Sequence, residues 1–557
     1  MRIERPENTV IVPVKGKRYV YTVAEKRYLK DRQYNINKRT CIGKMEDNTY
    51  MIPNAKFYRI FPELAELSDA PACSDVLKAG VYLAVKRIMH SRELDALLDD
   101  VYGRDGDMIK DAAAYMITSE DSVMQHFPPY EYEHPLFMER PAQDTAVCEM
   151  LKRHTVAEHD RFLAEWNRLQ KDAEGIYISY DSTNMNSAAE GIELLEFGHS
   201  KDGGSELPQV NVSIAFDQDN ATPLFYEMYP GSIVDNSQCQ IMVDKAKRYG
   251  YRNIGFILDR GYFSADNIRY FERNGYEFLL MARGNAQFIK EAIDTVRITL
   301  RNSSKYYIDE HEVLGTTVRQ KLFDDDTKRR YVHVFYDDVK GAEQHKGIMR
   351  RFALYDKELE KLTDRKLTRS FNVRKFEKYY RMRFYEDYLV SFSRKEKEIE
   401  KELDYCGYFV IVTSEKMNAE EALTRYRNRD TTEKQFLTEK SFLGGDTWRV
   451  HSDESLESKQ LIAFVALIVR NELFKSLGVL RKKEKKRYTV PAALRELDRI
   501  IITRDENGTF TMRYALTASQ KSIMKAIGMD EDEVRKEAKE LSKRYSSKAF
   551  SYNSVES

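Results

Sequence analysis

The sequence has few cysteines, no long apolar run and no excess of either charge. Its five cysteines are odd in number, far apart and never spaced as CxxC (Cys41, Cys73, Cys148, Cys239 and Cys406), which argues against a disulfide framework and a zinc site. No stretch approaches the roughly 18 to 20 consecutive apolar residues of a membrane-spanning helix, and the opening MRIERPENTV has no apolar signal-peptide core. We therefore expect a cytoplasmic protein without a membrane partner.

Charge is balanced overall but unevenly distributed. Lys plus Arg and Asp plus Glu both number 90, so the total lacks the basic excess that is usual for proteins that bind nucleic acid. Basic residues nevertheless predominate from Lys15 to Lys44, and the basic run RKKEKKR spans Arg481 to Arg487. A neutral total can conceal basic patches, although each run would also suit an ordinary solvated surface.

Strand and helix signals alternate from Ile176 to Ala282 in an informative order. The pattern predicts three strands, a helix, a buried strand, a second helix and a fifth strand; the strands are IYISYD (176–181), QVNVSIAFD (209–217), TPLFYEMY (222–229), NIGFILD (253–259) and EFLLMA. The order βββαβαβ is that of the RNase H-like topology, in which the first and fourth strands are adjacent and parallel. The predicted fold class is therefore α/β with an RNase H-like mixed-sheet core.

Other segments are expected to surround and interrupt this core, because 557 residues exceed one usual core. The expected parts are a basic β-rich segment (1–60), a helical region (61–172), the first part of the core (173–289), a β-rich insertion (290–406), the second part of the core (407–475), and a C-terminal helical region with a tail (476–557). The very apolar segment 461–474 is predicted to be a buried helix.

Two aspartates end strands of the predicted core. Asp181 ends the first strand and Asp259 the fourth, so we expect both at the carboxyl ends of adjacent parallel strands, where open α/β sheets place their sites. A hard divalent cation such as Mg²⁺ would relieve the repulsion between them. A single aspartate at a strand end is commonly a turn or cap residue. Only the complete pattern of strands and carboxylates indicates a catalytic role.

A predicted helix from about Asn418 to Phe442 carries a third carboxylate. At about 100° per residue, four side chains fall within an arc of roughly 60° on one face: Tyr426, Arg429, Glu433 and Lys440. A buried face would carry apolar residues, and a merely solvated face would not need a tyrosine. The stripe is therefore predicted to face a polar active site, although alone it would also suit a salt-bridged surface.

These motifs resemble those of the IS4-type DDE transposases, most closely the IS1634 branch. The family's helix signature is Tyr, two residues, Arg, three residues, Glu, six residues and Lys, and the stripe matches it without an insertion or a substitution. The two Asp motifs of the family correspond to YDSTN with Asp181 and LDRGYFS with Asp259. The resemblance covers roughly residues 170–475, and the N-terminal KRTCIGKM is also similar to that branch.

The resemblance implies a DNA transposase of an insertion sequence that works by cut-and-paste transposition. It implies a catalytic triad that binds Mg²⁺ or Mn²⁺, two ions in each active site, and consists of Asp181, Asp259 and Glu433. The other residues of the stripe would bind DNA or its phosphates: Tyr426, Arg429 and Lys440. The implied partners are the terminal inverted repeats, bound by the helical region 61–172, the target DNA, and a second copy in a homodimer.

Two alternative functions are left open by the sequence. An RNase H-like nuclease without transposition would keep the acidic triad but would not need the Tyr, Arg and Lys of the stripe. A domesticated remnant would only bind DNA, and the intact acidic residues argue against it. Inverted repeats flanking the gene, with a short duplication of target DNA outside them, would separate the three functions.

Overall fold

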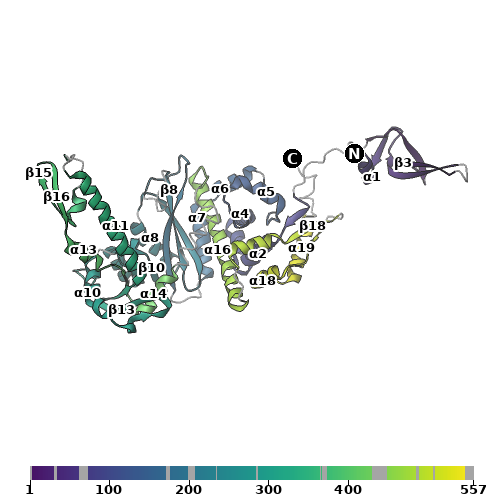
Figure 1. Cartoon of the computed structure of the whole chain (residues 1–557). Helices are drawn as coiled ribbons and strands as arrows, with labels where there is room; N and C mark the ends of the chain where they lie inside the picture. The colour runs from purple at the N-terminus through teal and green to yellow at the C-terminus, as the bar shows by residue number, and fades with distance from the viewer. Residues whose placement is uncertain are drawn as a thin grey trace. The chain divides into compact units, whose positions relative to one another are not determined.

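The computed structural model forms two compact units, one within residues 1–72 and one within residues 73–554 (Figure 1). The structure describes residues 3–14, 16–29, 34–61, 73–142, 144–170, 176–198, 207–233, 235–283, 286–363, 366, 373–429, 448–484, 488–505 and 509–545.

The N-terminal unit is an antiparallel sheet followed by a short helix. Its strands lie in the order β1-β5-β4-β3-β2, with the bounds β1 Ile3–Glu4, β2 Thr9–Val14, β3 Lys17–Leu29, β4 Tyr34–Met45 and β5 Tyr50–Pro53, and α1 Ala55–Ile60 follows. The unit has its own apolar core, formed by Val20, Ile42, Met45, Met51 and Phe57. The β-rich character predicted for this segment is confirmed.

Helices predominate in the second unit ahead of the central sheet. They are α2 Gly80–Ser91, α3 Leu94–Tyr102, α4 Gly106–Ser119, α5 Phe127–Glu133, α6 Asp144–Arg153 and α7 Val156–Leu169, with the 3-10 turns η2 Gly103–Asp105 and η3 Met124–His126. The long helix α16, Asp453–Glu484, contacts α2, α4 and α6. The segment 461–474 is helical, as predicted, and is buried from Leu461 to Leu473, whereas Phe474 is 45% exposed. No helix among the described residues combines the length and apolarity that crossing a membrane requires.

The central sheet has the predicted RNase H-like strand order. Five of its strands lie in the order β9-β8-β7-β10-β11 and span β7 Tyr177–Asn186, β8 Gln209–Asp217, β9 Thr222–Pro230, β10 Gly255–Leu258 and β11 Glu277–Met281. The first three strands pair antiparallel, whereas β10 is parallel to both β7 and β11. Helices α8 Asp235–Arg248 and α9 Ala265–Arg273 follow β9 and β10. The first and fourth core strands are therefore adjacent and parallel.

Two apolar clusters cover the two faces of this sheet. On one face, Ile178 and Phe256 join the large core of the second unit, which contains α16 and the helices ahead of the central sheet. On the other face, Tyr177 and Ile257 pack with Leu423 of α14, Ala419–Asn428. Alternate residues of a strand point to opposite faces. From Tyr177 to Asp181 on β7, and along β10, the parity of the residue number thus tells which of the two sheet faces a side chain lies on; further along β7, Met185 packs in a third cluster with Trp448.

Strand β7 extends beyond its predicted end. The sequence pattern ended the strand at Asp181, but pairing with β8 continues to Asn186, so the predicted end was wrong. The extension contains buried polar residues whose hydrogen bonds are satisfied across the sheet; Asn184, for example, donates to Asn211 Oδ1 over 2.7 Å. An apolar pattern does not detect such a pair. The parallel pairing with β10 does stop at Ser179.

The segment predicted to be a β-rich insertion both extends the sheet and adds a separate arm. Its strands β12 Tyr307–Ile308, β13 Val313–Gln320 and β14 Arg330–Tyr336 join the central sheet through β17 Tyr408–Thr413, which pairs with β11. The other elements are α10 Gln287–Arg301, α11 Asp338–Leu362, α12 Arg374–Glu377, the hairpin β15 Tyr380–Tyr385 and β16 Tyr388–Arg394, and α13 Glu396–Leu403. In Figure 1, α11 and the hairpin lie at one end of this unit. We call α11, α12, α13 and the hairpin the arm.

The C-terminal region is helical, as predicted, and also contains two short strands. Its elements are α17 Val490–Asp498, β18 Ile501–Arg504, β19 Phe510–Met512, α18 Ala518–Ala526 and α19 Glu531–Tyr545. Strand β18 pairs antiparallel with β19 and with β6, Val76–Lys78. This pairing joins the C-terminal region to the start of the helical region, far away in the sequence.

Candidate active site

Asp181 lies on β7 just beyond the parallel pairing with β10. Its side chain is 21% exposed, and its Oδ1 accepts a hydrogen bond from the Ser182 backbone N–H over 2.9 Å. The Ser182 hydroxyl in turn accepts from the hydroxyl of Tyr262 over 3.2 Å. Asp181 is therefore held on a paired strand. The next residue, Ser182, is itself held by the hydrogen bond from Tyr262.

Asp259 follows β10 directly and opens the 3-10 turn η4, Arg260–Tyr262. Its Oδ1 accepts the backbone N–H of Gly261 over 2.7 Å. A β-carbon on Gly261 would lie 2.9 Å from the same oxygen, so this glycine permits the carboxylate to approach the turn closely. Ser264 then caps α9 by accepting from the Asn267 backbone N–H over 3.2 Å. These local bonds orient the Asp259 side chain at the carboxyl end of β10.

The strand register aligns the two aspartates. Ser179 of β7 pairs with Ile257 of β10, and Asp181 and Asp259 each lie two residues further along. Adjacent strands are about 4.8 Å apart, and residues two apart point to the same face. That face is the one covered by α14, because Ile257 packs in the α14 cluster. The two carboxylates are therefore neighbours on the sheet face that carries α14: Asp181 lies within β7, just beyond its parallel pairing with β10, and Asp259 lies at the carboxyl end of β10.

Helix α14 brings two residues of the predicted stripe to the same place. The helix begins with a capping box in which Asn418 and Glu421 exchange two hydrogen bonds of 2.8 Å. At its other end, the Tyr426 hydroxyl donates to Met281 Sδ of β11 over 3.6 Å. Arg429, the C-terminal cap, donates from Nη1 to Asp181 Oδ2 over 3.3 Å. The carboxyl end of α14 thus contacts the strand that carries Asp181.

Arg429 is a buried cation beside the Asp181 carboxylate. It is 8% exposed, and its guanidinium carbon lies 5.4 Å from the ring centroid of Tyr426. Burial of an unpaired charge is strongly unfavourable, so the ion pair with Asp181 offsets part of the desolvation of both groups. The arrangement sets a positive charge next to oxygen ligands, which suits a phosphate-containing substrate.

Comparison with known proteins identifies the family. A family model described as "Transposase DDE domain" matches residues 176–469, more than half of the chain. The chain belongs to this family. The DDE transposases are phosphoryl-transfer enzymes and generally use divalent metal ions.

Two solved structures of transposases are also similar to this DDE-domain chain, at low identity. One is a piggyBac transposase synaptic complex with hairpin DNA, with 8% identity and a TM-score of 0.32 over 72% of this chain and 65% of that one. The other is a Mos1 transposase paired-end complex with the left transposon end, with 14% identity and a TM-score of 0.14 over 41% of this chain and 67% of that one. The chain therefore spans 65% of the length of the piggyBac transposase chain. No curated protein matches it.

The described carboxylates of this DDE-domain protein are suitable ligands for a divalent cation. Asp181 and Asp259 offer the hard oxygen ligands that Mg²⁺ and Mn²⁺ prefer. They are neighbours by register, and the Gly261 N–H orients one of the carboxylates. No group of three or more His, Cys, Asp or Glu side chains suited to a metal occurs among the described residues. The described part of the site therefore supplies two acidic ligands.

Two of the six predicted site residues, Glu433 and Lys440, lie outside the described residues, in the range 430–447. The structure brings together the other four: Asp181, Asp259, Tyr426 and Arg429. Helix α14 confirms the predicted helix start at Asn418 and is described to Asn428. Its continuation to Phe442 stays a prediction.

Residues that support the site were missed by the sequence reasoning. Tyr262 packs edge-on against Tyr180, with ring centroids 5.6 Å apart, and reaches Ser182 through its hydroxyl. Met281 accepts from Tyr426. The position of Tyr262 within the LDRGYFS motif could have suggested its role, whereas Met281 belongs to an ordinary apolar strand and carries no comparable signal.

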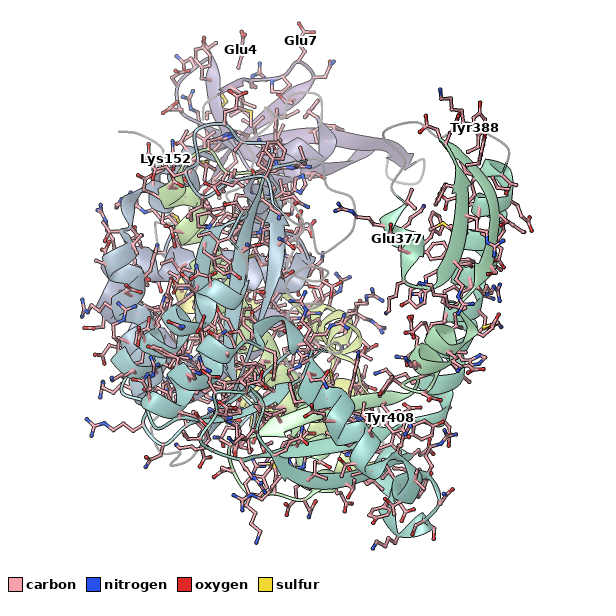
Figure 2. All side chains as sticks on the ribbon, turned by 90° about the vertical axis from the view of Figure 1, so that its left-hand side faces the viewer. Glu4, Glu7, Lys152, Glu377, Tyr388 and Tyr408 are labelled. Carbon is pink, nitrogen blue, oxygen red and sulfur yellow. The ribbon has the colours of Figure 1, made fainter. Side chains whose placement is uncertain are left out.

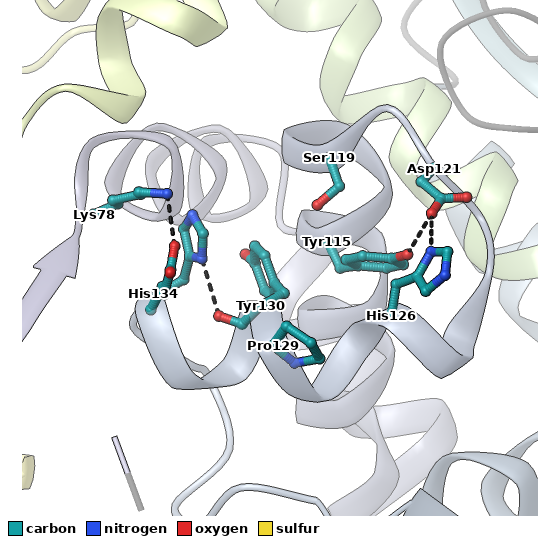
Figure 3. A pocket seen from close by; sticks show the side chains of 9 residues that line it. Lys78, Tyr115, Ser119, Asp121, His126, Pro129, Tyr130 and His134 are labelled. Carbon is teal, nitrogen blue, oxygen red and sulfur yellow. Dashed lines mark hydrogen bonds and ion pairs between the residues drawn. The ribbon is translucent and has the colours of Figure 1, made fainter. Parts of the chain in front are cut away.

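A separate pocket of about 280 Å³ lies in the helical region (Figure 3). Its polar groups are bonded to one another: Asp121 accepts from Tyr115 over 3.1 Å and contacts His126 over 2.6 Å, and Lys78 pairs with Glu133 over 2.7 Å. None of its lining residues comes from β7, β10 or α14. It is not part of the candidate active site.

Proposed function

We propose that this protein is the DNA transposase of an insertion sequence of the IS4 type, IS1634 branch. The main support is the alignment of Asp181 and Asp259 just beyond the parallel pairing of β7 and β10, on the sheet face that carries the helix with Tyr426 and Arg429. Membership of the transposase DDE domain family agrees with this function. The substrates would be the terminal inverted repeats and target DNA.

Asp181, Asp259 and Glu433 would hold the metal ions, Mg²⁺ or Mn²⁺ and two in each site. When bound, such ions activate the attacking oxygen and stabilise the leaving oxygen of an in-line displacement. Arg429 would orient the Asp181 carboxylate through its 3.3 Å contact. Together with Lys440, it would also neutralise phosphate oxygens beside the scissile bond. Tyr426 would position the terminal nucleotide.

The reaction would proceed in two phosphoryl transfers at this site. In the first, a water oxygen attacks the scissile phosphorus, the P–O3′ bond breaks, and the transposon end is left with a free 3′ hydroxyl. In the second, that hydroxyl attacks a phosphorus of the target strand, and the target P–O3′ bond breaks. Each transfer exchanges one phosphodiester P–O bond, so one set of acidic ligands suffices for both cleavage and joining.

We further propose that the chain acts in the cytoplasm as a homodimer that joins two transposon ends. The helical region 61–172 would contact the ends, with help from the basic β-rich segment 1–60. The core would comprise 173–289 and 407–475, interrupted by 290–406 and followed by 476–557. These assignments rest on the sequence pattern and on the order of the elements.

The decisive experiment replaces each acidic residue in turn: Asp181→Ala, Asp259→Ala and Glu433→Ala. We expect each variant to lose cleavage of a cognate transposon end, by at least about 10³-fold, and to retain end binding, because these residues hold metal rather than DNA. Asp266→Ala, an exposed aspartate in the first turn of α9, is the matched control and should cleave normally. Full cleavage by any of the three variants would remove that residue from the site.

A strand-joining assay separates the transposase from its alternatives. The transposase should join a precut end with a 3′ hydroxyl to an unrelated plasmid in the presence of Mg²⁺. A nuclease without transposition would cut and not join, and a remnant that only binds DNA would do neither. Inverted repeats beside the gene provide the cognate ends for this assay.

A further inference from the structure

A large basic pocket lies between the core and the arm. It has a volume of about 700 Å³, and its walls come from the start of η4, from β11, α10 and β17 on the core side, and from α11, α13 and the residues after α12 on the arm side. Figure 2 labels Tyr408, which lines the pocket, and Glu377, next to the lining residue Lys378. The pocket lies within the second unit.

Cations outnumber carboxylates on the walls of this pocket. Its six basic residues are Arg260, Lys290, Lys340, Arg351, Lys378 and Lys401, against the two acidic residues Glu398 and Glu402. Each carboxylate already has a partner, because Glu402 accepts from Arg351 over 2.6 Å and Glu398 from Lys401 over 2.8 Å.

The other four cations form no ion pair among the described residues, and of these Lys378 lies close enough to Glu398 and Glu402 for its charge to help lower the pKa of both carboxyls. Arg260, Lys290, Lys340 and Lys378 are exposed, and none of them has a carboxylate within ion-pair distance in the part of the chain that the structure describes. Four like charges gathered around one cavity repel one another unless a polyanion occupies it. The pocket is therefore complementary to a chain of phosphates.

The pocket adjoins the candidate active site. Arg260 immediately follows Asp259, and both belong to the turn at the end of β10. Met281, another lining residue, accepts the hydrogen bond of Tyr426. A strand whose phosphate lies at the two aspartates would thus have this basic cavity next to it.

Aromatic side chains alternate with the cations along the walls. The ammonium of Lys340 lies 4.8 Å from the ring centroid of Phe409, and that of Lys378 lies 4.5 Å from the ring of Tyr379. Both rings are half-buried. Phe409 is also stacked on Phe335, with ring centroids 4.9 Å apart, and the Tyr379 hydroxyl accepts from Lys378 over 2.6 Å. The feature of this pocket that is typical of sites for unpaired nucleic acid is therefore its row of cations, which can track a backbone. A cavity of this size is too small for a duplex, which is about 20 Å wide, whereas it can hold a few nucleotides.

We propose that this pocket binds a short unpaired stretch of the DNA strand that adjoins the scissile phosphate. The proposal rests on the proposed transposase function and adds to it the path of one strand, from the carboxylates past Arg260 to Lys340 and Lys378 of the arm. Phosphates would contact the four cations.

The test measures DNA binding and needs no catalysis. The full-length protein is titrated into a fluorescent oligothymidylate of about 20 nucleotides, and into a duplex of equal length, at several salt concentrations. The pocket variant is Lys340→Gln with Lys378→Gln. The control removes two charges from exposed positions of α11 outside the pocket, Lys346→Gln with Lys357→Gln. Thermal melting checks that both variants are folded.

The pocket variant should bind the single strand about tenfold more weakly. Its slope of log K against log salt should fall by about 1.4, since each lost phosphate contact lowers it by about 0.7 for a single strand. Duplex binding should change much less, and the control pair should resemble the parent. Lys290→Gln alone should lower the slope by about half as much.

The proposal would be overturned if the pocket variant bound the single strand as tightly as the parent. It would also be overturned if the control pair lost as much single-strand affinity as the pocket variant, or if the pocket variant lost as much affinity for the duplex. Full competition by micromolar thymidine monophosphate would also overturn it, because it would reveal a mononucleotide site. If the pocket variant binds the single strand more weakly as expected but the parent fails the strand-joining assay, the result would count against the transposase function alone.

Discussion

Arg429 connects helix α14 to the strand that carries Asp181. It contacts Asp181 over 3.3 Å while its guanidinium lies close to the ring of Tyr426. A planar guanidinium can satisfy a carboxylate and an aromatic ring at once, whereas an ammonium is a point charge. The role that we propose for Arg429 therefore depends on its shape as well as on its charge.

Replacement of Arg429 should reduce catalysis without preventing DNA binding. We expect Arg429→Ala to lower the rate of end cleavage about 10- to 100-fold, because it removes a charged hydrogen bond of roughly 1.5 to 3 kcal/mol. Arg429→Lys should recover only part of the loss. Arg427→Ala is the control: its side chain lies on the same helix and donates to the His311 carbonyl over 3.3 Å. An equal loss in this control would show that the helix, rather than the Asp181 contact, is responsible.

At the residue scale, the two aspartates could be predicted and their support could not. Asp181 and Asp259 were found because each ends a run of apolar residues in a known strand order. The contact of Arg429 with Asp181 depends on the position of α14 over the sheet. That position is set by the packing of Leu423 and its neighbours. Such packing leaves no pattern in a single sequence.

Among the elements, α16 contains a half-buried acid, Glu457, whose protonation is coupled to folding. Burial raises the pKa of Glu457 to about 7; Lys245 opposes the shift, and Glu227, Asp160 and Asp453 add to it. Lys245 is itself bonded to Glu227 over 2.5 Å and lies 3.6 Å from Asp160. In the folded protein, Glu457 therefore keeps its proton at a pH where an exposed glutamate has lost it.

This raised pKa predicts that stability falls as the pH increases. The folded state binds the proton more tightly than the unfolded state, so the contribution is complete below about pH 4.5 and is lost as the pH rises to about 7. Glu457→Gln cannot titrate and should be more stable than the parent at pH 8, by on the order of 1 to 3 kcal/mol. Melting temperatures at pH 5.5 and pH 8 measure the difference. Glu454→Gln, one turn earlier and exposed, should not stabilise the protein; a parent-like pH dependence of Glu457→Gln would refute the coupling.

At the element scale, the apolar strands could be predicted better than the polar ones. The buried strand Gly255–Leu258 and the strand Glu277–Met281 have sequences that are almost wholly apolar. The polar end of β7 was missed, because Asn184 and Asn211 satisfy each other inside the sheet. That β12 to β14 would extend the central sheet could not be predicted either, since strand pairing across a long gap depends on tertiary contacts.

For the whole molecule, the division into two units implies that the second folds alone. Each unit has its own core, and the apolar cluster of the N-terminal sheet contains no residue beyond Phe61. We expect a chain that starts at Cys73 to melt within about 2 °C of the full-length protein. Circular dichroism and calorimetry measure this directly. A large drop in melting temperature would show that the N-terminal unit stabilises the rest.

The two aspartates also differ in how firmly the backbone holds them. Asp181 lies within the β7–β8 ladder, opposite Ile214, whereas Asp259 lies past the last residue of β10, in a short turn. Backbone in a buried ladder opens far less readily than a turn. A rigid anchor paired with a compliant one would let the spacing of the carboxylates adjust as the attacking group changes from water to a DNA hydroxyl, while Asp181 remains a fixed reference point.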